Sequence, residues 1–208
     1  MLDAAARLAT EHSVRTVTLT DIATEVGMHK SAMLRYFETR EDIFLRLAAS
    51  AWQDWAAEVR DRIGALTTCP TTAQPEWGTT ARTIAGILAQ SLVTRPLFCD
   101  LLAHTLMNLE RNVSLDTVRD FKLCAIAEVA AIGDTLDAVT PLDADQARSV
   151  VATATSMAGA LWQMAAPGTH LRALYETDPE LAHSVVEVEP SVTGILTALL
   201  TGYASDPA

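Results

Sequence analysis

The 208-residue chain has little of what marks membrane-spanning, secreted and metal-binding proteins. No segment offers the roughly 18 uninterrupted apolar residues of a membrane span, so no membrane partner is expected. The three cysteines, Cys69, Cys99 and Cys124, are odd in number and far apart, which argues against a disulfide framework or a paired-cysteine metal site. Asp3 and Arg7 interrupt what would be the apolar region of a signal peptide. The sequence therefore predicts a cytoplasmic protein without a metal.

Residue patterns of common catalytic sites are also missing. The five histidines form no HxxxH or HExxH pattern, and neither a GxSxG motif nor a glycine-rich phosphate loop occurs. We therefore expect neither an enzyme nor a cofactor. Half of the residues are hydrophobic and only 5% are aromatic, with much Ala and Leu, which favours an all-α protein.

The net charge of −11 is distributed unevenly along the chain. Residues 1–46 contain six basic and seven acidic residues, so almost all of the acidity belongs to residues 47–208. An acidic chain is an unusual DNA-binding protein, but this acidity lies outside the N-terminal segment. The overall charge gives a slight preference for neutral or cationic small-molecule ligands over anionic ones.

Residues 18–37 predict two short helices joined by a tight corner. Thr18 is a good N-cap, and Asp21 lies three residues further on, as in a capping box. Apolar residues then follow at helical spacing, and Gly27 ends the helix because glycine enters the left-handed conformation at little cost. Lys30–Phe37 is predicted as a second helix that is too short to be stable alone. Thr39 then begins a long helix. This is a helix-turn-helix, which places its second helix in the major groove of DNA.

This segment resembles the DNA-binding domain of TetR-family transcriptional regulators. The resemblance extends over about 45 residues, from residue 2 to residue 47, and its pattern is carried by Thr18, Ile22, Ala23, Val26, Gly27, Phe37, Arg40 and Glu41. Several positions depart from the family pattern. Leu34 stands where a tyrosine is usual, Arg40 replaces a lysine, and Ser13 replaces the glycine that closes the first helix.

The resemblance implies an N-terminal DNA-binding domain, residues 1–46, joined by a long helix to a helical effector-binding and dimerisation domain, residues 47–208. In it, Thr18, Thr20 and Arg40 are expected to hold phosphates. His29, Lys30, Ser31, Met33 and Arg35 are expected nearest the base edges, with apolar and hydroxyl contacts from Leu34 and Tyr36. Lys30 is the best candidate for guanine.

Further helices are predicted at about residues 40–66, 80–93, 96–111, 114–138, 143–165 and 190–203, with a loop at 67–79. The helices at 143–165 and 190–203 hold the small and apolar residues suited to a homodimer interface. The resemblance favours such an interface, although the residues alone fit an internal core equally well. The predicted interface residues are Val150, Ala154, Met157, Ala158, Leu161, Ile195, Leu196, Leu199 and Tyr203.

The resemblance also implies an effector pocket among the helices between residues 80 and 138. Its candidates are Phe98, Leu102, His104, Met107, Phe121, Cys124, Trp162 and Met164. The alternative is that they form an ordinary helical core. Cys99 and Cys124 fit buried structural residues better than oxidant sensors.

The sequence therefore predicts a homodimeric repressor that leaves a palindromic double-stranded DNA operator when it binds an unknown small molecule. The competing hypothesis is a helical adaptor whose helix-turn-helix binds a protein instead of DNA.

Overall fold

The computed structural model describes residues 1–68 and 76–205, and within these ranges it contains helices but no strand. The α-helices are α1 (Leu2–His12), α2 (Leu19–Glu25), α3 (Lys30–Met33), α4 (Arg40–Gly64), α5 (Trp77–Val93), α6 (Pro96–His104), α7 (Leu115–Val139), α8 (Ala144–Ala165), α9 (His170–Thr177) and α10 (Val188–Ser205). Short 3₁₀ turns occupy Ala65–Thr68 and Ala182–Ser184, and a π-helical turn occupies Thr105–Leu109. The all-α prediction is confirmed.

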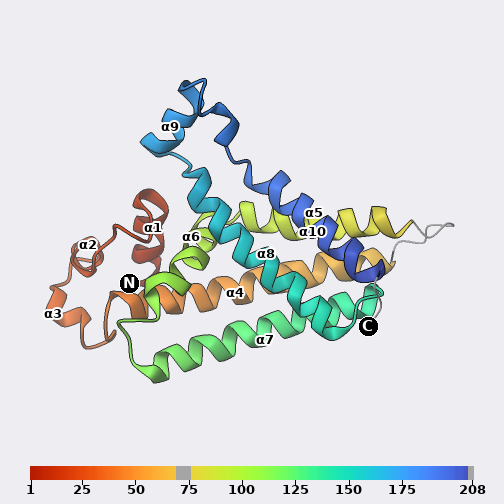
Figure 1. The fold of residues 1–208 in the computed structure, drawn as a ribbon. Coiled ribbons are helices and arrows are strands. Elements are labelled where there is room, and N and C mark those ends of the chain that lie inside the picture. The colour runs from red at the N-terminus through yellow and green to blue at the C-terminus, as the bar shows by residue number, and fades with distance from the viewer. Residues whose placement is uncertain (69–75, 206–208) are drawn as a thin grey trace.

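The first three helices form a small body at one end of the molecule (Figure 1). α1 packs on α2 and on the start of α4, and α2 packs on α3. Fully buried Ile22, Met33 and Ile43 join these elements. α4 then runs the length of the molecule and leaves this body for the C-terminal helices, as the sequence predicts.

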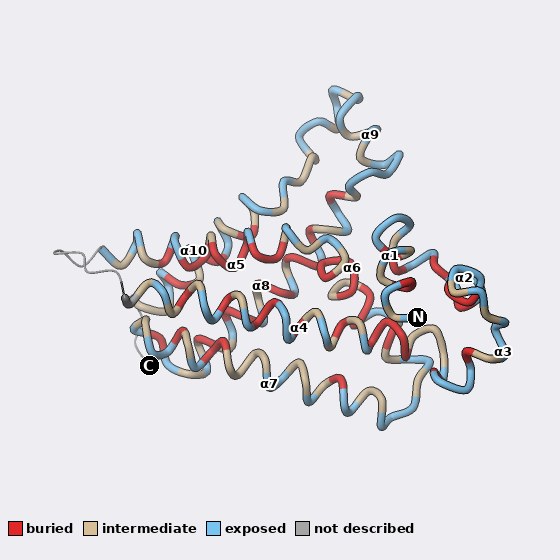
Figure 2. Tube along the Cα trace, turned by 180° about the vertical axis from the view of Figure 1, so that it is seen from behind, coloured by how far each residue is buried: buried red, intermediate tan, exposed pale blue. Residues whose placement is uncertain are grey.

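The C-terminal helices pack in pairs along α4. α4 lies against α7, α5 against α10, and α8 crosses both α6 and α7 (Figure 1). Where α8 meets α6 the backbones are close, because a Cβ added at Gly159 would lie 3.0 Å from the amide nitrogen of Ala103. The buried residues follow the inner faces of these helices (Figure 2).

An aromatic cluster forms the centre of this packing. The ring centroids of Trp52 and Trp55 are 5.5 Å apart, and Phe98 of α6 lies 5.5 Å from Trp52 and 5.8 Å from Trp55. The indole nitrogen of Trp55 donates a hydrogen bond of 2.8 Å to Ser91 Oγ, which satisfies its polar group in the core. The cluster fixes α4, α5 and α6 against one another.

Several predicted boundaries differ from the structure. α5 begins at Trp77 rather than at residue 80, and α10 begins at Val188 rather than at 190. The helix predicted for residues 96–111 is α6 followed by the π-helical turn. Cys69 and most of the loop predicted at 67–79 lie outside the described residues.

α9 projects from the bundle between α8 and α10 (Figure 1), and none of its residues is buried. Among the described residues, no individual helix combines the length and apolarity of a membrane span. The bent pair α5–α6, with 88° between its helices, does so only when the two are taken together.

Candidate DNA-binding surface and effector cleft

The start of α2 is fixed by the predicted capping box. Thr18 Oγ accepts a hydrogen bond of 3.2 Å from the backbone amide of Asp21, and Asp21 Oδ2 accepts one of 2.8 Å from the amide of Thr18. The side-chain hydroxyl of Thr18 and then its amide hold the pKa of Asp21 below its ordinary value. Two amides that α2 could not satisfy itself are thereby paired.

The corner after α2 depends on Gly27, which has φ +66°. The amide of Met28 returns to the carbonyl of Ala23 at 2.9 Å and closes the end of α2. The predicted role of Gly27 is confirmed. Because the corner is tight, α3 begins only three residues later, at Lys30.

α3 is shorter than predicted. Lys30–Met33 is α-helical, and residues 34–36 continue as turns in which Tyr36 and Phe37 donate their amides to the carbonyl of Met33, at 2.9 and 3.1 Å. The prediction of one helix to Phe37 is therefore wrong in its second half. Buried Met33 and Phe37 anchor the segment, so its other side chains face solvent.

The corner, α3 and the following turn carry a group of exposed side chains, most of them polar. His29, Lys30, Ser31, Leu34, Arg35 and Tyr36 are all exposed, as are Thr18 and Thr20 at the start of α2. His29 Nδ1 lies 3.1 Å from Ser31 Oγ across the first turn of α3. Lys30 and Arg35 give this surface its positive charge.

Two predicted contacts in this set are corrected by the structure. Met33 is fully buried and cannot touch a base edge. Arg40 donates hydrogen bonds to the carbonyls of Val14 and Val17, and its guanidinium lies 2.8 Å from Glu41. Arg40 therefore ties the segment between α1 and α2 to α4, instead of presenting its guanidinium to a phosphate.

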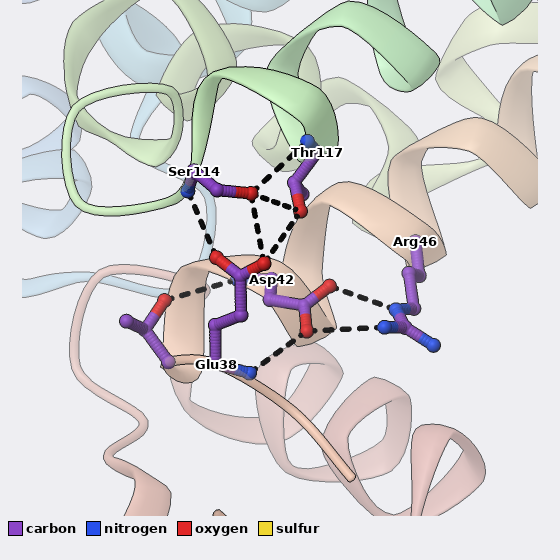
Figure 3. Close-up of polar contacts among 6 residues, drawn as sticks. Glu38, Asp42, Arg46, Ser114 and Thr117 are labelled. Atoms are coloured by element: carbon purple, nitrogen blue, oxygen red, sulfur yellow. Dashed lines mark hydrogen bonds and ion pairs between the residues drawn. The ribbon is translucent and has the colours of Figure 1, made fainter.

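Glu38 joins the end of this segment to the first turn of α7 (Figure 3). Its carboxylate accepts hydrogen bonds from Ser114 N and Ser114 Oγ, both at 2.8 Å, and from Thr117 Oγ at 3.2 Å. The backbone amide of Ser114 is the main reason that the pKa of Glu38 is lowered. Buried Asp42 supports the arrangement, because its carboxylate accepts from the amide of Glu38 and from Arg46.

A second connection centres on Asp100 of α6, which is 6% exposed. Its carboxylate accepts from Val14 N at 2.7 Å and Ser13 Oγ at 2.9 Å, both between α1 and α2, and from Gln163 of α8 at 2.8 Å. His104 Nε2 lies 3.4 Å away, too far for a good hydrogen bond but close enough for an electrostatic contact. Burial alone would raise the pKa of Asp100, but these contacts outweigh it and lower the pKa.

The C-terminal helices enclose an open cleft of about 430 Å³. Most of its lining comes from α7 and α8, and Trp52 of α4 and Leu102 of α6 also contribute. Its lining is Trp52, Leu102, Thr105, Phe121, Lys122, Ala125, Ile126, Val129, Ala130, Arg148, Thr155 and Ser156. The volume falls within the roughly 300–1,000 Å³ of small-molecule sites.

Sequence comparison assigns both halves of this arrangement. Residues 1–47 match the family described as bacterial regulatory proteins, tetR family, and residues 49–207 match the tetracyclin repressor-like C-terminal domain. The chain belongs to the TetR family. It is a transcriptional regulator with a DNA-binding and a ligand-binding domain. No curated protein matches the chain.

Solved structures share the TetR-family fold over nearly the whole chain. FadR from Bacillus subtilis, solved in complex with stearoyl-CoA, is 17% identical, with a TM-score of 0.55 and coverage of 95% of this chain and 96% of FadR. PfmR from Thermus thermophilus is 15% identical, with a TM-score of 0.54 and 96% coverage of both chains. The fatty acid degradation regulator FadR from Bacillus halodurans is 15% identical, with a TM-score of 0.53 and coverage of 94% and 95%. At these identities the similarity shows the fold alone.

Only two of the eight predicted pocket residues of this TetR-family protein, Leu102 and Phe121, line the cleft. The other six predictions are wrong for this cleft. Phe98 lies in the aromatic cluster, and His104 lies beside Asp100. The thiol of Cys124 on α7 faces the carbonyl of Ala49 in α4. Met107 and Met164 are exposed on the surface, and Trp162 lines a separate groove at the base of α9.

Five of the nine predicted interface residues are buried within the subunit. Val150, Ala154, Ala158, Leu161 and Leu196 belong to the internal core, so their prediction as interface residues is wrong. α8 and α10 pack on α6, α7 and α5 and use these side chains to do so. Ile195 is exposed, and Met157, Leu199 and Tyr203 are partly exposed, so these four stay predictions.

Sequence reasoning missed the charged residues of these sites as well as most of the uncharged residues that line the cleft. Lys122 and Arg148 look like ordinary surface residues of a helix, and Asp100 looks like an exposed acid between apolar neighbours. The departure at Ser13 was a usable signal. Ser13 has φ 79°, which explains why glycine is usual there, and its hydroxyl binds Asp100.

The pKa of the Cys99 thiol is raised to about 12 by burial, which makes its reactive thiolate scarce and fits the structural role predicted for it.

Proposed function

We propose that the chain is a homodimeric repressor that binds a palindromic operator and is released from it by a small molecule. The observation that carries the proposal is the set of exposed side chains between His29 and Tyr36. Buried Met33 and Phe37 hold them outward just before α4 begins. A regulator of this kind would act in the cytoplasm, where chromosomal DNA is accessible.

In the proposed complex, the corner and α3 enter the major groove. Thr18 and Thr20 hold phosphates, and His29, Lys30, Ser31 and Arg35 lie nearest the base edges. Leu34 and Tyr36 add apolar and hydroxyl contacts. Lys30 is the residue that we expect to recognise guanine, because its ammonium group can donate to the two acceptors that guanine presents there.

The small positive charge of this surface supports a dimer. Each N-terminal domain has a net charge of about −1 and few exposed basic side chains, so one domain alone would hold DNA weakly. Two linked domains that bind half-sites about 34–36 Å apart would gain affinity without new contacts. We propose that Met157 of α8 and Ile195, Leu199 and Tyr203 of α10 contribute to the dimer interface.

The two polar connections support a switch. α7 forms one wall of the cleft, and Glu38 holds the first turn of that helix beside the DNA-binding surface. Asp100 connects α6 and α8 to the segment before α2. A molecule that prefers a different spacing of α7 and α8 would shift the population away from the DNA-competent arrangement. FadR from Bacillus subtilis, which carries stearoyl-CoA, supports ligand binding by a protein of this fold.

The DNA-binding part is tested with fragments from beside the gene, measured by fluorescence anisotropy. Lys30→Ala should weaken binding to the selected operator by about 1–3 kcal/mol, with a smaller loss on random DNA. Arg82→Ala removes the same charge from an exposed site near the start of α5 and is the control. Failure of the wild-type chain to prefer any fragment would refute operator binding and favour the adaptor hypothesis.

The dimer is tested separately, by light scattering after size exclusion. The wild-type chain should elute with twice its mass of 22.3 kDa, and Ile195→Glu should shift it toward the monomer. Leu123→Glu, on an exposed part of α7, is the control. A monomeric wild-type chain that binds a whole palindrome at full strength would overturn the dimer.

A further inference from the structure

The cleft between α7 and α8 follows α7 for about two and a half turns. The residues of α7 that line it extend from Phe121 to Ala130, nine positions at about 1.5 Å each, or roughly 13 Å of helix. Apolar side chains dominate this wall, with Ala125, Ile126 and Val129 between its ends. Such a cleft suits an elongated apolar molecule.

All charged residues that line the cleft are basic. They are Lys122 of α7 and Arg148 of α8, with side chains 42% and 43% exposed, and no carboxylate is part of the lining. A cationic ligand would therefore meet like charge in the lining, whereas an anionic group would meet an ammonium or a guanidinium. The net charge of −11 favours the opposite ligand class, but the charges that adjoin the ligand decide its preference.

The two basic residues belong to different ends of the cleft. Lys122 follows Phe121 at one end. The stem of Arg148 crosses from α8 to α7 beyond the other end, since a Cβ added at Gly133 would lie 3.0 Å from Arg148 Cγ. Gly133 thus provides the space in which the arginine lies.

Both basic groups have acidic partners that lie outside the lining. Lys122 Nζ is 2.7 Å from Glu110 Oε1, and Arg148 Nη2 is 2.5 Å from Asp145 Oδ1. The Asp145 side chain is 91% exposed, so its pair with Arg148 is weak, whereas the Glu110 side chain is only 21% exposed and holds Lys122 more firmly. Arg148 also keeps further N–H donors, so a ligand carboxylate can bind it beside Asp145 or in its place.

Two hydroxyl groups of the lining are already committed as donors. Thr105 Oγ donates to the carbonyl of Leu101 at 2.7 Å, and Thr155 Oγ donates to that of Val151 at 3.1 Å. Ser156 is the third hydroxyl of the lining, so recognition of an anionic end depends on the charges of Lys122 and Arg148, with Ser156 as a further donor.

We infer that the ligand of this cleft is an elongated apolar molecule with an anionic group, a carboxylate or a phosphate, at one end. The inference rests on the proposed function, since it names the chemical class of the effector. The apolar part lies along α7 and is buried by Trp52 and Leu102, and the anionic end lies at Lys122 or at Arg148.

The test compares four probes with the same ten-carbon chain, below the concentrations at which they form micelles. Decanoate and decyl phosphate carry an anion, decyltrimethylammonium carries a cation, and decanol is neutral. Calorimetry on the full chain should give dissociation constants at least about tenfold lower for an anionic probe than for the other two. The two anions distinguish a carboxylate site from a phosphate site.

Two substitutions then locate the anionic end. Either Lys122→Gln or Arg148→Gln should weaken binding of the preferred anion about tenfold and leave decanol unchanged. Arg119→Gln, which removes a charge from α7 outside the cleft, should have no effect. Equal binding of all four probes, tighter binding of the cation, no measurable binding of any probe, or anion binding that neither substitution weakens would overturn the inference.

Release of DNA is measured in a separate assay, so that the two proposals can fail independently. If the anion binds but the operator complex persists, the ligand class stands and the effector role falls. If no probe binds while the chain still recognises its operator, the ligand class falls and DNA binding stands.

Discussion

Gly27 in the N-terminal domain and Gly159 in the C-terminal domain are both needed, but for different reasons. Gly27 has φ +66°, and a Cβ added there would meet nothing within 4 Å. Gly159 has ordinary helical geometry, but an added Cβ would lie 3.0 Å from the backbone of Ala103. The first requirement is local to the chain, and the second exists only after α6 and α8 have packed.

The same contrast extends to the two functional regions. The DNA-binding surface is made by one continuous segment, so its residues could be predicted in sequence order. The cleft takes its lining from α4, α6, the π-helical turn, α7 and α8, and only two of its predicted residues lie there. The predictions below test this contrast between local and tertiary requirements, from the largest expected effect to the smallest.

Asp100→Ala should have the largest effect, because it removes a tertiary contact between the domains. Val14 N, Ser13 Oγ and Gln163 Nε2 would lose their acceptor, and all three are far from Asp100 in sequence. We expect the free energy of unfolding to fall by about 3 kcal/mol in a urea titration. Asp134→Ala, an exposed acid on α7, is the control and should change it by less than about 0.5 kcal/mol. Equal effects of the two would show that the buried connection contributes little.

Gly159→Ala should lower the free energy of unfolding by about 2 kcal/mol, because α6 and α8 must separate to admit the methyl group. Gly86→Ala on α5 is a matched control, since an added Cβ there meets nothing within 4 Å. The control should stabilise the helix by up to about 1 kcal/mol. Chemical unfolding of both variants measures the difference, and a stabilised Gly159→Ala would contradict the close approach.

Gly27→Ala should cost about 1–2 kcal/mol through backbone strain alone, since the added methyl group meets no neighbour. The local origin of the effect has a second consequence. Gly27→Asn should recover part of the loss, because asparagine tolerates the left-handed conformation better than alanine. Denaturant titration of the two variants checks this order, and equal losses would argue against strain as the cause.

The smallest effect is expected in the pH dependence of stability. The pKa of Asp100 in the folded chain lies below its ordinary 3.8, so its contribution is present above about pH 4 and is lost as the pH falls through the folded value. The gap in unfolding free energy between the wild type and Asp100→Asn should therefore be constant from about pH 6 to about pH 4 and narrow below that. His104 faces Asp100 and is the largest of the contacts that lower its pKa, so the gap between the two chains includes this pair. A gap that widens in acid would show that the folded pKa is raised instead.

Much of the fold could be predicted because its signals are local. Thr18 and Asp21 form the capping box, Gly27 ends α2, and the long helix begins next to Thr39, all as predicted. The apolar periodicity located the later helices to within a few residues, except for α9, which was not predicted. The end of α3 was missed because residues 34–36 have ordinary helix propensity, and only the burial of Met33 and Phe37 fixes the turn that replaces it.

The sequence by itself determined the TetR-family class, the order of the helices other than α9, and the stretch proposed to face DNA, since capping, glycine conformation and periodicity act within a few residues. Only the tertiary structure decided which apolar residues are core and which are free, as with Leu196 and Ile195. It also decided that Arg40 turns inward and that Lys122 and Arg148 border one cleft. These outcomes depend on how helices distant in sequence cross, and apolar side chains alone do not specify which neighbour will cover them.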